Sequence, residues 1–178
     1  MTQNGGEDSS GVDRAKAEKQ VEQLDRILDE YEDRIGIKRP EYNKEVDEYL
    51  ELTKAKMTLM SYEECVQARY LLEQYSFHLL KILNKEKSRA EWCKTNIDII
   101  YARDAKQYKG SSWQSWEETR NLVIAGNIYT QKLNEIWIKA RNRMVRLEGL
   151  PEKISFMSKA LYSLEQCKRG FGERSRTD

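Results

Sequence analysis

Apolar side chains recur at intervals of three and four residues along most of the chain, and no stretch shows the alternation of a half-buried strand. Residues 12–35 illustrate the pattern, because a charged segment there carries an apolar seam formed by Val21, Leu24, Leu28, Tyr31 and Ile35. This spacing predicts a helix with the seam of a short coiled coil. A lone helix of this kind is marginal in water, so the sequence predicts that it packs against a partner.

The clearest helix start is a capping box at Ser61 and Glu64. The serine hydroxyl accepts from the backbone of the glutamate, whose carboxylate reaches back to the serine amide. From there the helical pattern runs over residues 62–109 without proline or glycine, which predicts a central helix roughly 70 Å long. A proline just upstream predicts a second helix over residues 40–56.

Glycine and proline divide the second half of the chain. Gly110 and the two serines after it predict a break. A helix is expected over residues 117–148, softened at Gly126, and Pro151 starts or kinks the last helix.

These patterns predict an all-α, elongated helical protein with a long central helix, heptad seams and oligomeric packing. We expect a flexible tail (1–11), an acidic helical arm (12–58), a helical core (59–172) and a second tail (173–178). Self-association is expected through seam residues Val21, Leu24, Leu28, Tyr31, Leu161 and Leu164.

The charge distribution changes this picture more than the net charge does. The chain has 178 residues, of which 31 are basic and 30 acidic. Residues 1–80 contain 11 basic and 18 acidic side chains, and residues 81–178 contain 20 and 12. An acidic half followed by a basic half is typical of a nucleic-acid-binding region with an acidic arm, and it is also compatible with self-association.

Several classes of protein are not expected. No run of 18 apolar residues predicts a membrane span, and the N-terminus lacks the pattern of a signal peptide, so we expect a cytoplasmic chain (host cytoplasm if a phage encodes it). Three widely spaced cysteines predict reduced thiols, and His78 is the single histidine. Without a glycine-rich phosphate loop or a nucleophile beside a base, we expect neither an enzyme nor a cofactor.

A stripe of four cations is the first candidate binding surface. On a helical wheel these side chains fall within about 60° of one another, beside the apolar face. They are Lys132, Lys139, Arg143 and Arg146. A phosphate backbone would relieve their mutual repulsion. The alternative is a solvated face neutralised by the acidic arm of a neighbouring subunit.

A second candidate surface combines cations with aromatic rings around the predicted break. Single-stranded nucleic acid is commonly held by cations along its backbone and by rings that stack on its bases. The cations are Lys94, Arg103, Lys106 and Lys109, and the candidates for stacking are Tyr101, Tyr108, Trp113 and Trp116. The alternative is that these rings belong to a core or an interface.

Residues 86–94 read Glu-x-x-Arg-x-Glu-x-x-Lys. This pattern resembles the central helix of the UvsY-type recombination mediators of large tailed bacteriophages. Residues 120–125 resemble the basic-x-Val-Leu stretch of that family, and residues 168–171 resemble its closing Arg-Gly-Phe. The resemblance covers residues 60–172.

The resemblance implies an all-helical, ring-like homo-oligomer that binds single-stranded DNA without sequence preference and needs no cofactor. It also implies a mediator role, in which the protein helps a recombinase displace a single-strand-binding protein and form its filament. Arg89 and Lys94 match the family pattern directly, and both are expected to contact nucleic acid. The family's DNA-contacting Lys-x-Arg pair falls on Ile99 and Tyr101, so Arg103 and the two lysines after it are expected to take over.

A second function stays open on the sequence. A helical coiled-coil structural or assembly adaptor without nucleic-acid binding would use the same seams and pair its basic half with acidic halves. The acidic segment 12–35 is then a docking arm for a basic partner, or, in a DNA-binding protein, a cover for the basic groove when DNA is absent.

Overall fold

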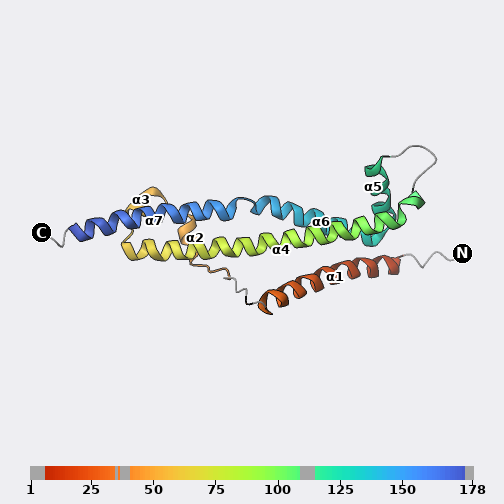
Figure 1. Ribbon diagram of the computed structural model, residues 1–178, viewed down its shortest axis with the longest axis horizontal. Helices are drawn as coiled ribbons and strands as arrows, with labels where there is room; N and C mark the ends of the chain where they lie inside the picture. Colours follow the sequence, from red (N-terminus) through yellow and green to blue (C-terminus); the bar gives the residue numbers. More distant parts are fainter. Residues whose placement is uncertain (1–6, 35, 37–40, 109–114, 175–178) are drawn as a thin grey trace. The chain divides into compact units, whose positions relative to one another are not determined.

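The structure, a computed structural model, describes the backbone of residues 7–34, 36, 41–108 and 115–174. Side chains are described within these ranges from residue 13 to residue 169. The regular elements of this part of the chain are all α-helices, without a strand, so the predicted all-α class is confirmed (Figure 1). None of these helices is both long enough and apolar enough to cross a membrane.

In the described part of the chain, seven helices follow one another (Figure 1). In order they are α1 (Glu7–Arg34), α2 (Val46–Leu50), α3 (Lys54–Leu59), α4 (Tyr62–Tyr108), α5 (Trp116–Gly126), α6 (Ile128–Leu147) and α7 (Leu150–Arg174). The predicted long central helix is α4, whose 47 residues extend over about 70 Å. Helix α1 begins inside the segment that was expected to be a tail.

The predicted capping box at the start of α4 is confirmed. The Glu64 amide donates to Ser61 Oγ at 3.1 Å, and the Ser61 amide donates to Glu64 Oε2 at 2.6 Å. The hydrogen bond from the Ser61 amide lowers the pKa of the Glu64 carboxyl. Met60 and Cys65, which flank the box, are both buried in one apolar cluster, so the cap also fixes where the chain enters the core.

The single helix predicted over residues 40–56 is wrong. Two short helices, α2 and α3, occupy this segment, and Pro40 itself lies outside the described residues. Thr53 has an extended backbone and its hydroxyl accepts from the Lys56 amide at 3.3 Å. A residue that caps a new helix cannot continue the previous one, so Thr53 separates the two.

The helix predicted over residues 117–148 is also divided in two. Helix α5 ends at Gly126, and Asn127 adopts an extended backbone. The side-chain oxygen of Asn127 accepts from the amides of Tyr129 at 2.9 Å and Thr130 at 3.2 Å. Asn127 therefore caps α6, and Gly126 marks a complete break where only a softening was expected.

The chain folds as two compact units, and neither is a continuous stretch of sequence. Unit 1 contains α1, the part of α4 from Asn84 onward, α5, and α6 up to Val145. Its core cluster joins α1, α4 and α6 through Ala17, Val21, Cys93, Ile97 and Leu133. The contacts of α1 pair its early residues with late residues of α4, so these two helices are antiparallel.

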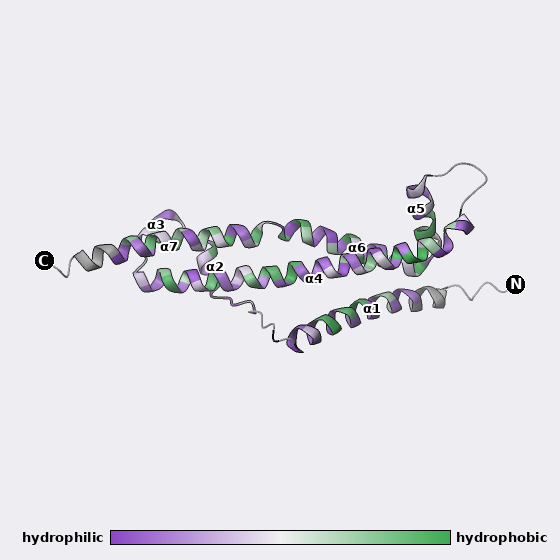
Figure 2. Ribbon diagram, viewed as in Figure 1, coloured by the Kyte–Doolittle hydropathy of each residue, from purple (hydrophilic) through white to green (hydrophobic). Residues whose placement is uncertain are grey.

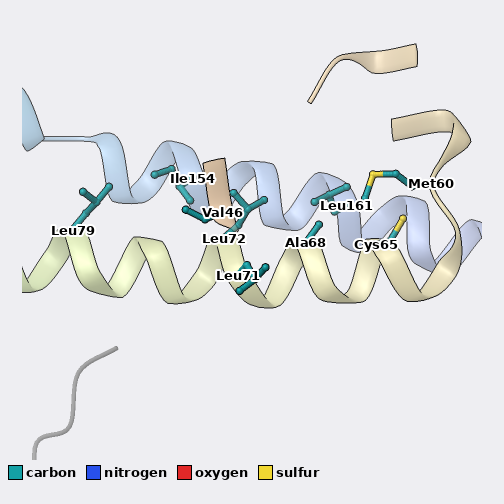
Figure 3. Packing of buried hydrophobic residues seen from close by; sticks show 9 residues of the cluster. All are labelled: Val46, Met60, Cys65, Ala68, Leu71, Leu72, Leu79, Ile154 and Leu161. Carbon is teal, nitrogen blue, oxygen red and sulfur yellow. The ribbon is translucent and has the colours of Figure 1, made fainter. Parts of the chain in front are cut away.

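Unit 2 contains α2, α3, the part of α4 up to Leu83, and α7. Figure 3 shows its core, in which side chains of α4 and α7 point toward one another. Leu72 and Leu161 are almost fully buried there, and Val46 of α2 joins them. The Ser76 hydroxyl donates to the Pro151 carbonyl at 3.0 Å, which ties the first turn of α7 to α4.

The predicted seams are occupied within the chain itself. Hydrophobic and hydrophilic residues are interspersed along α4, α6 and α7, as Figure 2 shows, and buried hydrophobic residues of these helices form the two cores. Val21 and Leu161 are buried, and Leu164 packs against the core of unit 2. Leu24 and Leu28 are half-buried on α1, Tyr31 is exposed, and Ile35 lies outside the described residues. Three of the six seam residues expected to associate, Val21, Leu161 and Leu164, thus pack within the chain, and the expected association through the seams stays a prediction.

Candidate nucleic-acid interface

Helix α1 presents its carboxylates to cations of α4. Arg89 Nε donates to both carboxylate oxygens of Asp25 at 3.0 Å, and Arg89 Nη2 donates to the same group. This fork-shaped contact raises the pKa of Arg89, chiefly through the hydrogen bonds to Asp25. Lys85 Nζ lies 3.0 Å from Asp29, one turn further along. Arg89, predicted to contact DNA, is thus neutralised by the acidic arm.

Glu86 connects this contact to α6. Its carboxylate is only 4% exposed and accepts from Arg89 Nη1 at 2.8 Å and from Arg143 Nη1 at 2.7 Å. Asp25, Arg89, Glu86 and Arg143 therefore form a chain of charges across three helices. A buried carboxylate is tolerated only when it is paired in this way, which fixes the register of α6 on α4.

A second contact joins α1 to α6. Lys132 Nζ lies 2.7 Å from Glu18 Oε1 and 3.4 Å from Glu135 Oε2, and only 14% of the lysine side chain is exposed. The hydrogen bond between Lys132 and Glu18 lowers the pKa of the carboxyl and raises that of the amine. The carboxylates that neutralise this stripe come from the same chain, whereas the sequence suggested a neighbouring subunit.

These contacts border an open cavity, which we call the arm groove. It has a volume of about 240 Å³ and lies where α1, α4 and α6 meet. Four of its charged side chains belong to the network described above, and Val21, Ile136 and Ala140 form its apolar floor. Lys139 lies exposed at its edge and acts on Glu18 through its charge. Helix α1 therefore covers the basic face of α4 and α6 and leaves the arm groove open.

The second predicted surface lies where α4 and α5 meet. The rings of Tyr101 and Trp116 are in edge-to-face contact with centroids 5.7 Å apart, and Trp116 is 57% exposed. The Arg120 guanidinium lies 5.7 Å from the centre of the Trp116 ring and 3.5 Å from Asp98. We call Tyr101, Trp116 and Arg120 the aromatic cluster. The Tyr101 ring and the Arg120 guanidinium both contact the indole and fix its orientation, and its exposed part is available for stacking.

Other predicted contact residues are spread along α4 and α6. Lys94, Arg103 and Lys106 are exposed on α4, and Arg103 is hydrogen-bonded to Asp104 at 2.6 Å. Arg103 lowers the pKa of the Asp104 carboxyl. Arg146 is exposed in the last turn of α6.

The remaining aromatic candidates do not join the cluster. The Tyr108 ring packs against the backbone of Gly126, where an added Cβ would lie 2.7 Å from Tyr108 Cζ. Tyr108 therefore ties the end of α4 to the end of α5. Lys109 and Trp113 lie outside the described residues, as does the predicted Gly110 break.

Two of the three cysteines, Cys65 and Cys93, are not activated. Cys93 and Cys65 are fully buried, and burial raises the pKa of the Cys93 thiol to about 11 and also raises that of Cys65. Reactivity resides in the thiolate, so both side chains are core residues. Within the described residues no group of histidine, cysteine and carboxylate side chains is arranged to hold a metal ion.

Sequence reasoning missed the acidic partners and one cation. Asp25 lies four residues after Val21, so helical spacing alone places it on the buried face of α1. Glu86 belongs to the motif that carries the family resemblance, yet its bridging role depends on α6, which is far away in sequence. The sequence indicates Arg120 only as part of the stretch that resembles the family, because nothing in the neighbouring sequence shows that Arg120 lies beside Trp116.

The chain matches none of the protein-family models, curated proteins or solved structures with which it was compared. The resemblance to UvsY-type mediators therefore stays a prediction from the sequence motifs.

Proposed function

We propose that this protein is a single-stranded-DNA-binding accessory protein of recombination. The observation that carries the proposal is the aromatic cluster, in which an exposed indole is supported by Tyr101 and Arg120. Stacking of bases on such rings is tolerant of sequence because every base has a π-face. Exposed Lys94, Arg103 and Lys106 on the same helix supply charge for the backbone of the strand.

The mediator role extends this proposal to protein partners. A protein that holds single-stranded DNA by stacking and charge can present it to a recombinase while a single-strand-binding protein is displaced. These two partners follow from the motif resemblance at residues 86–94, and the binding of DNA is the step that the aromatic cluster supports.

Self-association supplies the avidity that weak stacking sites require. Helix α4 carries Tyr70 and Phe77, seven residues apart, and they are 61% and 55% exposed. In an antiparallel pairing of two copies, Tyr70 of one lies opposite Phe77 of the partner subunit. The same pairing brings Glu63 within one helical turn of Lys81 of the partner subunit, so the charges are complementary. The homo-oligomer is therefore proposed to form through this face of α4.

A helical assembly adaptor is the second candidate function. The neutralisation of Arg89, Lys132 and Arg143 within the chain favours it, since paired cations leave less free charge for phosphate. The two functions differ in one respect that is easily measured, which is binding to oligo(dT).

The test compares two exposed aromatic residues. Trp116→Ala should weaken binding of fluorescent oligo(dT) by about 5- to 100-fold, because stacking contributes roughly 1–3 kcal/mol per base. Phe156→Ala is the matched control. Phe156 is also 57% exposed and has the Lys159 amine 5.2 Å from its ring, but it lies on α7. Equal binding by the two variants would favour the adaptor function.

A further inference from the structure

The basic face beneath α1 is already occupied by anionic groups. Asp25 and Glu18 of α1 neutralise Arg89 of α4 and Lys132 of α6. Arg89, Lys139 and Arg143 line the arm groove, together with Glu18 and Asp25. The carboxylates of Glu18 and Asp25 therefore contact the cations that the phosphates of a bound strand would contact.

The attachment of α1 combines ion pairs with a small apolar contact. Among its described side chains only Ala17 and Val21 are buried apolar residues, Asp25 is the third buried residue, and Leu24 and Leu28 are half-buried. Ile27 and Tyr31 are about half exposed, so part of the apolar surface of this helix is not used for docking. The ion pairs of such a helix exchange readily for those of another polyanion, because the cations retain a partner throughout.

The open cavity also indicates that α1 can leave this face. A permanent helix interface is packed to the density of a protein interior. Here about 240 Å³ remains open beside Lys139, between the acidic helix and its basic receptor. Space at an ion-paired interface allows an incoming phosphate to reach Lys139 and Arg143 before α1 has left.

We propose that the α4–α6 face beneath α1 is a second binding site for single-stranded nucleic acid, and that the strand displaces α1 from it. This proposal rests on the DNA-binding function proposed above and adds its regulation. Phosphates replace Glu18 and Asp25 on Lys132 and Arg89, and they recruit Lys139. The apparent affinity of this site for the strand is then its intrinsic affinity multiplied by the fraction of molecules in which α1 is not docked.

The first experiment weakens α1 docking in the full-length chain. Glu18→Gln with Asp25→Asn should tighten binding to oligo(dT) about three- to tenfold at low salt. Glu30→Gln with Asp33→Asn is the control, since it removes the same charge from exposed positions of α1. The first pair should also steepen the fall of affinity with salt, because fewer ion pairs within the chain are broken on binding. Equal effects of the two pairs would overturn the proposal.

The second experiment needs no substitution. Hydrogen exchange of the α1 amides in the unaltered protein should accelerate when oligo(dT) is added. Unchanged or slower exchange would overturn displacement. Faster exchange with poly-glutamate but not with oligo(dT) would also overturn it and would identify an acidic protein segment as the ligand.

The two proposals fail in different ways. If the unaltered protein binds oligo(dT) through Trp116 but the Glu18 and Asp25 variant gains nothing over its control, only the displacement of α1 is lost. If neither protein binds oligo(dT) at low salt, the DNA-binding function is lost and the displacement with it.

Discussion

At the scale of single residues, Glu86 shows how a charge can organise a helical interior. It is almost completely buried and receives hydrogen bonds from two arginines on different helices. Removing one member of a buried ion pair leaves the others without compensation, which costs more than the pair contributes by itself.

Substitution of Glu86 should therefore destabilise the fold. Glu86→Gln leaves Arg89 and Arg143 facing a neutral amide, and we expect the free energy of unfolding to fall by about 3 kcal/mol. Urea denaturation followed by circular dichroism measures this loss. Glu91→Gln, an exposed glutamate on the same helix, should change the stability by less than about 0.5 kcal/mol. Similar small losses for both would show that the bridge across the helices does not contribute.

Glu18 should titrate below its ordinary value. Its hydrogen bond to Lys132 lowers the pKa from 4.5, so docking of α1 through Glu18 is complete above pH 4.5 and is lost as the pH falls through the lowered pKa. An NMR titration of the Glu18 carboxyl should give a midpoint below 4.5, which Lys132→Ala returns toward 4.5. Lys16→Ala is the control on α1 itself. A midpoint unaffected by Lys132→Ala would exclude this contact in solution.

At the scale of helices, a start that a local cap encodes can be predicted from the sequence, whereas a break inside a helical pattern cannot. The Ser61 capping box is encoded within four residues, so the start of α4 is readable from sequence alone. The Ser115 and Glu118 box, which starts α5, has the same form and was overlooked. The break at Gly126 was harder to predict, because a glycine within a helical pattern can be tolerated. The break is made by the extended backbone of Asn127, whose side chain caps α6, and the Tyr108 ring, 18 residues earlier, packs against Gly126 at this point.

This contact gives a prediction for Gly126. Alanine normally stabilises a helix over glycine, but here an added Cβ would lie 2.7 Å from Cζ of Tyr108. Gly126→Ala should lower the thermal stability by about 1–2 kcal/mol. In the Tyr108→Ala background the same change should be neutral or stabilising. Thermal unfolding of the four proteins of this cycle measures the coupling, and additive effects would contradict the close approach.

At the scale of the whole molecule, the division of charge has a structural counterpart. The acidic excess of the first 80 residues faces the basic excess of the later ones within unit 1, through α1 on α4 and α6. Periodicity could predict the all-α class and the basic stripe. It could not predict which side chains would neutralise that stripe, because the pairing depends on how distant helices pack.

Self-association can be tested by a charge exchange on α4. Light scattering should report a mass above that of the 21.1 kDa chain. Lys81→Glu should weaken the association, because the proposed antiparallel pairing places Lys81 within one helical turn of Glu63 of the partner subunit, and adding Glu63→Lys should restore it. Phe77→Glu should give a monomer, whereas Phe156→Glu, at similar exposure on α7, should not. A mass unchanged by all of these variants would remove this face of α4 from the proposal.

The salt dependence of oligo(dT) binding tests the central claim most directly. If the strand is held near Trp116 by Lys94, Arg103, Lys106 and Arg120, the unaltered protein binds at low salt. A plot of log affinity against log salt then has a slope of about −3, since each phosphate neutralised in a single strand contributes about −0.7. Absence of binding at low salt, or an affinity independent of salt, would contradict the account.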